Sequence, residues 1–147
     1  MKMPLKILLA DDDKDDRLFF KLALDTLSTP TDLEVVVDGE KLMSYLAENS
    51  KKLPDVLFLD LNMPRKNGFE CLTEIRLNKI FKNLPVIIFS TSYEQEVVNQ
   101  LFINGARNFM RKPADFFHLK KIIEKTVHHI LKKEATKPLK ENFVLKL

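Results

Sequence analysis

The sequence has little of what marks secreted or membrane proteins. Cys71 is the single cysteine among 147 residues, which excludes an internal disulfide and makes a reducing cytoplasm the expected compartment. The apolar runs are too short to span a bilayer. The apolar part of the amino-terminal MKMPLKILLA stops after a few residues at Asp11, so we interpret it as a first strand and not as a signal peptide.

Most of the chain also lacks an excess of one charge. The net charge is +3, and residues 132–147 supply it with five lysines against two glutamates, so residues 1–131 are neutral overall. A basic end of this kind is usually a solvated face, and direct nucleic-acid binding is not favoured. With 45% apolar and 31% charged residues, the composition is that of one ordinary globular domain with a substantial core.

Short apolar runs alternate with segments of helical period. In the first such segment the period places Leu18, Phe19, Leu22, Ala23 and Leu27 along one helical face. The pattern predicts strands at 6–10, 33–39, 55–60, 85–90 and 108–112, and helices at 16–27, 40–48, 69–78, 94–105 and 114–133.

Five such strand–helix units predict an α/β fold, with a parallel sheet that carries helices on both faces. Polar side chains stand where the strands stop: Asp11 and Asp12 after the first, Asp60 after the third, Ser90 after the fourth and Lys112 after the fifth. Because the carboxyl ends of parallel strands share one edge, we expect these groups to converge there.

Each of these residues also has an ordinary structural explanation. The acidic run 11–16 suits the start of a helix, and we expect Asp13 and Asp16 to do only this, while Asp115 is the expected N-cap of the last helix. Ser90 alone would be a turn residue and Lys112 alone a solvated strand end. The combination of acids, hydroxyl and lysine at the strand ends indicates a functional site more specifically than any one of these residues does.

The convergent groups suit one kind of chemistry. Three neighbouring carboxylates repel one another and must bind a cation or shift their pKa values. Mg²⁺ prefers such oxygen ligands, and a Lys and a hydroxyl beside it are the equipment of phosphoryl transfer. Asp60 would then be the nucleophile.

Four phrases of the sequence, ILLADDD, PDVLFLDLNMPRKNGFE, PVIIFSTS and GARNFMRKP, resemble in order the receiver domain of two-component response regulators, over about residues 5–131. The resemblance implies a flavodoxin-like, doubly wound sheet with strand order 2-1-3-4-5. It also implies that Asp60 accepts phosphate from a histidine kinase or a histidine phosphotransfer protein. Such a domain promotes only its own phosphotransfer and dephosphorylation and is not otherwise an enzyme.

The resemblance further assigns the metal ligands. Asp12 and Asp60 would bind Mg²⁺ directly, Asp11 would bind it through water, and the backbone carbonyl of Asn62 would complete the set. Gly68, in the segment PDVLFLDLNMPRKNGFE, would have a structural role.

Other residues acquire roles in signalling from the same resemblance. Lys112 would pair with the carboxylate or phosphoryl group and precede a cis peptide bond to Pro113. Ser90 would turn toward the phosphoryl group and Phe109 would turn inward, which changes the surface of the fourth helix, fifth strand and fifth helix. The alternative for Phe109 is a plain core aromatic.

Asn62 and Ser92 occupy the positions where the family tunes its dephosphorylation rate. The segments DLNMPRKNGFE and STSYEQEV are similar to those of small single-domain regulators that serve phytochrome-like and other histidine kinases. We therefore expect a stand-alone receiver domain over 1–133 and a short basic tail over 134–147.

Several alternatives stay open on the sequence alone. The tail is either a frayed end, or its Phe143, Val144 and Leu145 pack on the sheet's own helices or on a second subunit. A homodimer through the fourth helix, fifth strand and fifth helix is a further expectation. A haloacid-dehalogenase-like phosphatase would want a second carboxylate where Asn62 stands, and a docking module that is never phosphorylated would not need the acceptor set.

Overall fold

The computed structural model describes residues 3–132 and 139–146, and it has the predicted alternation of strands and helices. Each predicted element is present, with ends that differ by up to three residues. The elements are β1 (Leu5–Ala10), α1 (Lys14–Asp25), β2 (Thr31–Val36), α2 (Gly39–Glu48), β3 (Val56–Leu59), α3 (Gly68–Leu77), β4 (Val86–Ser90), α4 (Gln95–Ile103), β5 (Asn108–Arg111), α5 (Phe116–Leu131) and the 3₁₀ helix η1 (Lys140–Asn142).

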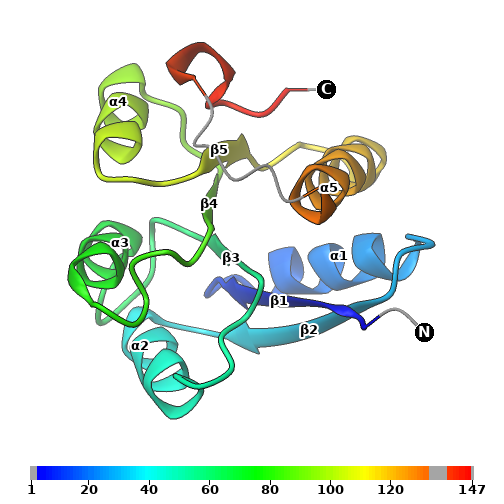
Figure 1. Ribbon diagram of the computed structural model, residues 1–147. Coiled ribbons are helices and arrows are strands. Elements are labelled where there is room, and N and C mark those ends of the chain that lie inside the picture. The colour runs from blue at the N-terminus through cyan, green and yellow to red at the C-terminus, as the bar shows by residue number, and fades with distance from the viewer. Residues whose placement is uncertain (1–2, 133–138, 147) are drawn as a thin grey trace.

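The strands form one parallel sheet in the order β2-β1-β3-β4-β5, which confirms the predicted topology. Helices α1 and α5 cover one face, and α2, α3 and α4 cover the other (Figure 1). The register pairs Ala10 with Leu59 and Leu59 with Ile88, so the central strands stop at nearly the same level. All five carboxyl ends therefore lie along one edge of the sheet.

The buried face of α1 differs in part from the prediction: Ala23 is buried as expected, but three of the predicted residues are not. Leu18, Phe19 and Leu22 are exposed at 52%, 45% and 43%. The residues that face the sheet are Phe20, Ala23 and Leu24. Apolar residues cover more than one stripe of this helix, and the sheet takes the stripe whose Phe20 ring packs edge-on to the core aromatics Phe58 and Phe89, with ring centroids 4.9 and 5.6 Å away.

Side-chain caps fix where the helices begin. Asp13 accepts the Asp16 N–H at the start of α1, and Asp115 accepts the His118 N–H at the start of α5, as predicted for Asp115. Gly68 opens α3 where the backbone comes too close for a side chain, since a Cβ there would lie 2.4 Å from the Asp60 carbonyl oxygen.

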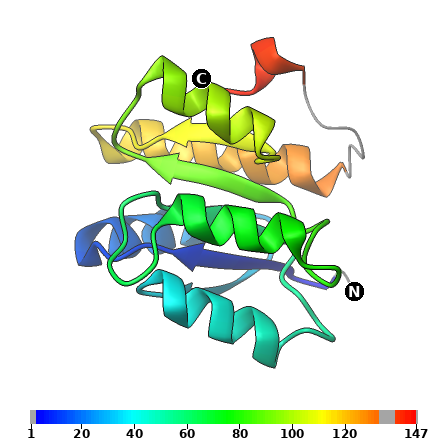
Figure 2. The same cartoon turned by 90° about the vertical axis from the view of Figure 1, so that its left-hand side faces the viewer.

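The C-terminal segment, which we define as residues 139–146, lies against the edge strand β5 beside α4 (Figure 2). Val144 forms a parallel bridge with Phe109, and Phe143 is only 1% exposed. Of the two alternatives for the tail, its described part therefore packs on the chain's own sheet. Residues 133–138 lie outside the described residues, so the proposed domain limit at residue 133 stays a prediction.

A search of the described residues finds no helix that is both long enough and apolar enough to cross a bilayer.

Candidate functional site

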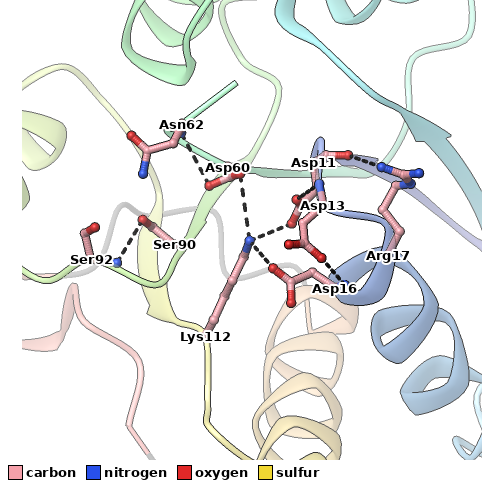
Figure 3. A network of polar contacts seen from close by, with 9 residues as sticks. All are labelled: Asp11, Asp13, Asp16, Arg17, Asp60, Asn62, Ser90, Ser92 and Lys112. Carbon is pink, nitrogen blue, oxygen red and sulfur yellow. Dashed lines mark hydrogen bonds and ion pairs between the residues drawn. The ribbon is translucent and has the colours of Figure 1, made fainter. Parts of the chain in front are cut away.

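The predicted site residues meet at the carboxyl edge of the sheet (Figure 3). Backbone hydrogen bonds continue the strand ladders into the loops: Asp60 N–H donates to the Ala10 carbonyl at 2.9 Å, and Lys112 N–H to the Ser90 carbonyl at 2.8 Å. The side chains that follow the strands are thereby held in register. We name as the acidic rim the group Asp11, Asp12, Asp16, Asp60, Ser90 and Lys112.

Three carboxylates of the rim come close together. One oxygen each of Asp11, Asp12 and Asp60 lies within 4.8 Å of the others. Asp11 is fully buried, Asp60 is 5% exposed and Asp12 is exposed. Burial raises the pKa of Asp60 to about 6, and Asp11 and Asp12 add to the rise while Lys112 opposes it. Burial also raises the pKa of Asp11.

Lys112 lies among these carboxylates and forms a longer ion pair with Asp60 than with Asp11 and Asp16. Its Nζ is 2.8 Å from Asp11 Oδ2 and 2.8 Å from Asp16 Oδ2, and 3.8 Å from Asp60 Oδ2. Burial lowers the pKa of Lys112, but its close contacts with the Asp11 and Asp16 carboxylates and the charge of Asp60 outweigh this effect and raise the pKa. The ammonium group therefore stays charged next to the acceptor candidate.

Asp16 is the rim residue that sequence reasoning missed. The sequence predicts only that it favours the start of α1, whereas the structure shows it bonded to Lys112, 96 positions away in the chain. A signal was present, because Asp16 stands three residues after the N-cap Asp13 and helical side chains point back toward the N-terminus. That direction leads to the rim.

The rim has the donor set of a divalent-cation site. Among the described residues, Asp11 Oδ2 is the one buried side-chain oxygen or nitrogen without a hydrogen-bond partner, although the Lys112 ammonium is near it. Clustered carboxylate oxygens are the ligands that hard cations such as Mg²⁺ and Mn²⁺ prefer. The residues present thus fit a divalent cation.

Ser90 and Asn62 both lie near Asp60, across it from Asp11 (Figure 3). Ser90 is fully buried, and its Oγ accepts the Ser92 N–H at 3.3 Å. A hydroxyl that accepts through oxygen still has its proton to donate. The Asn62 N–H is 3.4 Å from Asp60 Oδ1, which places Asn62 beside the acceptor candidate.

Phe109 is fully buried beneath the C-terminal segment and α4, and its ring lies edge-on to Tyr93 with centroids 5.8 Å apart. It pairs in the sheet with Ile88, two residues before Ser90. Alternate residues of a strand share a face, so Ile88 and Ser90 point to the same side of the sheet. Phe109 packs in the core cluster on that side.

The predicted cis bond before Pro113 is wrong. No peptide bond within residues 3–132 and 139–146 is cis. Proline lowers the preference for trans without abolishing it, so a cis bond needs a turn that demands it. Here the trans backbone already lets Lys112 reach Asp11 and Asp16.

The fold and the acidic rim together define a class: α/β signalling domains with a carboxylate at the tip of a central strand. The sequence profile of the Response regulator receiver domain matches residues 7–124. The chain belongs to this family of two-component response regulators.

Individual relatives agree with this assignment. Response regulator Rcp1 of Synechocystis sp. (strain ATCC 27184 / PCC 6803 / Kazusa) is 33% identical over 129 residues, which cover 82% of this chain and 87% of that protein. The phosphorylated cyanobacterial phytochrome response regulator RcpA superposes with a TM-score of 0.81 at 30% identity, over 93% of this chain and all of that one. The Mn²⁺-bound form of Rcp1 gives 0.77 at 28% identity, over 92% of this chain and all of that one.

The phosphatase and the unphosphorylated docking module are not favoured by these findings. The chain is a signalling receiver domain, and nothing in the fold or the comparisons points to a conventional enzyme.

Proposed function

We propose that Asp60 is the phosphoacceptor of this receiver domain. One observation carries the proposal: a nearly buried carboxylate stands beside two further acids and a charged lysine that stops 3.8 Å short of it. In the reaction an Asp60 oxygen attacks the phosphorus of a phosphohistidine. The P–N bond breaks as the P–O bond forms, and the leaving imidazole nitrogen takes up a proton.

The acidic rim would hold Mg²⁺ during this reaction. We infer from the family resemblance that Asp12 and Asp60 ligate it directly, Asp11 through water, and Asn62 through its backbone carbonyl. When bound, the cation supplies positive charge that offsets the acids and the phosphoryl oxygens.

Lys112 would stabilise the transferred group. A lysine ammonium has three donors, and two of them face Asp11 and Asp16. The 3.8 Å gap to Asp60 is too long for a hydrogen bond and leaves the third donor for an oxygen of the phosphoryl group. Asn62 and Ser92 flank the place where this group would stand, which suits their proposed role in tuning dephosphorylation.

Exposed apolar residues beside the rim suit docking of the phosphodonor protein. A small pocket joins Asp16 and Lys112 of the rim to Phe19 and Phe116. A donor that brings a phosphohistidine to Asp60 must cover this surface, and a histidine kinase or histidine phosphotransfer protein is the donor that the chemistry requires. The exposed apolar side chains that line this pocket are Phe19 of α1 and Phe116 of α5.

The output would leave through the α4–β5–α5 face. Ser90 would turn toward the phosphoryl group and Phe109 would move into the space beside it, which biases this face between two arrangements. A protein partner, or a second copy of the chain in a homodimer, would bind there. The buried thiol of Cys71, which forms no disulfide, suits the cytoplasmic location that we propose for this signalling.

The acceptor can be tested with small phosphodonors. Acetyl phosphate or phosphoramidate with Mg²⁺ should add the mass of a single phosphoryl group to the intact protein, and a chelator should prevent it. Asp60→Asn should abolish the addition. The matched control Asp15→Asn makes the same change of charge at an exposed position in the first turn of α1 and should be labelled like wild type. Labelling of Asp60→Asn at the wild-type rate would refute the assignment.

A further inference from the structure

The edge of β5 is occupied by the chain's own C-terminal segment. The Phe109 N–H donates to the Phe143 carbonyl at 3.0 Å, and the Leu145 N–H donates to the Phe109 carbonyl at 2.8 Å. The Asn108 side chain adds a hydrogen bond to the Phe143 carbonyl at 3.0 Å. The segment thus pairs with an edge strand that would otherwise present unpaired backbone groups.

Apolar packing holds the segment on both sides of the sheet edge. Phe143 is buried between β5 and α4, where its ring lies edge-on to Phe102 with centroids 5.3 Å apart. Val144 packs on the core cluster of the α2–α4 side, and Leu145 packs on that of the α1–α5 side. Together these contacts cover the β5 part of the proposed output face.

The segment is attached at the proposed switch residue. Both backbone hydrogen bonds of the pairing are made to Phe109, whose side chain shares a core cluster with Phe143. The Phe109 ring also contacts Tyr93, in the loop that follows Ser90. If Phe109 moves toward Ser90, its ring leaves the core cluster in which Phe143 is buried. The packing around Phe143 would then be weakened.

We propose that residues 139–146 are a removable cover of the output face, held in the unphosphorylated protein and loosened when Asp60 is phosphorylated. The inference rests on the proposed acceptor role of Asp60. Release would expose the β5 edge and the apolar seat of Phe143, a surface that fits a partner presenting an extended strand with an aromatic side chain. The output surface would then become available to its partner only in the phosphorylated state.

The first test measures amide hydrogen exchange of the full chain in Mg²⁺, with and without beryllium fluoride. Beryllium fluoride imitates the phosphoryl group. The Phe109 and Leu145 amides should exchange on the order of tenfold faster in the loaded state. The Leu5 amide, bonded to the Pro30 carbonyl beyond the far end of the sheet, should not change.

The second test uses the reciprocity of coupled equilibria. If phosphorylation loosens the segment, then loosening the segment must favour the loaded state by the same factor. Phe143→Ala should bind beryllium fluoride roughly fivefold or more tightly than wild type. Leu139→Ala, at a position of the same segment that is 65% exposed, should bind as wild type does.

The outcomes separate the two proposals. If wild type takes up neither phosphoryl group nor beryllium fluoride, the acceptor assignment fails and this inference fails with it. If it takes them up at Asp60 but the two amides keep their exchange rates, the acceptor role stands and the cover is refuted. The exchange experiment needs no variant, so poor folding of Phe143→Ala would not obscure the result.

Discussion

The acidic rim and the covered β5 edge both contain buried side chains, but the rim buries carboxylates and the edge buries an aromatic ring. At the rim, Asp11 and Asp60 are buried carboxylates whose pKa values burial raises, so their charges are held there at a cost in stability. At the edge, Phe143 gains stability from apolar burial and regular backbone pairing. The rim therefore has charge that a ligand can neutralise, whereas the edge is held by apolar packing and backbone hydrogen bonds.

The largest expected effect on stability lies at the edge. Phe143→Ala should lower the free energy of unfolding by about 3–5 kcal/mol, because a buried aromatic ring is lost and a cavity remains. Leu139→Ala, which removes an exposed side chain from the same segment, should change it by under about 0.5 kcal/mol. Urea denaturation of both variants measures the difference. Equal effects would show that the edge is not a packed region.

At the rim, removal of a side-chain charge should have the opposite sign. Asp60→Asn should stabilise the metal-free protein at pH 7 by about 1–3 kcal/mol, since the neutral amide avoids burying a charge. The pKa of Asp60 is raised from 3.8 to about 6, so the folded protein binds more protons than the unfolded chain between those values. Wild-type stability should therefore fall as pH rises from about 4 to 6, and Asp60→Asn should flatten this fall.

Denaturation in a chelator across this pH range checks the prediction. A wild-type stability that rises with pH through the window, with no such rise in Asp60→Asn, would contradict a buried Asp60 that retains its proton.

A cation should relieve the cost at the rim and leave the edge alone. Mg²⁺ at tenfold its dissociation constant should stabilise wild type by about 1.4 kcal/mol, because it binds the folded state. Asp12→Asn should lose most of this gain, and Asp15→Asn should keep it. Thermal unfolding with and without Mg²⁺ measures the gain, and an undiminished gain in Asp12→Asn would remove that residue from the ligand set.

Among the substitutions at the rim, the smallest effect on stability is expected at Asp16. Asp16→Asn should change the free energy of unfolding by under about 1 kcal/mol, since the Asp16 side chain is 31% exposed and water screens its pairing with Lys112. The pKa of Lys112 should nevertheless fall, because one of the carboxylates that raise it is gone. NMR titration of the Lys112 amine measures this shift. An unchanged pKa would show that the Asp16 carboxylate does not stabilise the charged form of Lys112.

The rim was predictable because it follows from topology. Once the apolar runs indicated parallel strands, Asp60, Ser90 and Lys112 had to fall on one edge, whatever the details of the loops. Asp16 was not predictable in the same way because its partner lies on a distant strand, and a local pattern shows only that an acid suits the start of a helix.

The errors and the open alternatives of the sequence-based prediction lie where a local pattern does not decide between several arrangements. Helix α1 has apolar residues on more than one side, and only the sheet decides that Phe20 and not Phe19 is buried. The isomer before Pro113 depends on the whole turn around it. The docking of Phe143 depends on an edge strand more than thirty residues earlier, and nothing near it in the sequence reveals which surface it meets.

Asp60, the acid at the tip of β3, is the residue that we propose to carry the phosphoryl group. Borohydride reduces an aspartyl phosphate to homoserine, and peptide mapping of the treated protein locates the converted residue. After phosphorylation with acetyl phosphate and Mg²⁺, we predict conversion at position 60 alone. Conversion at Asp11 or Asp12 instead, or a protein that takes up no phosphoryl group, would contradict the claim.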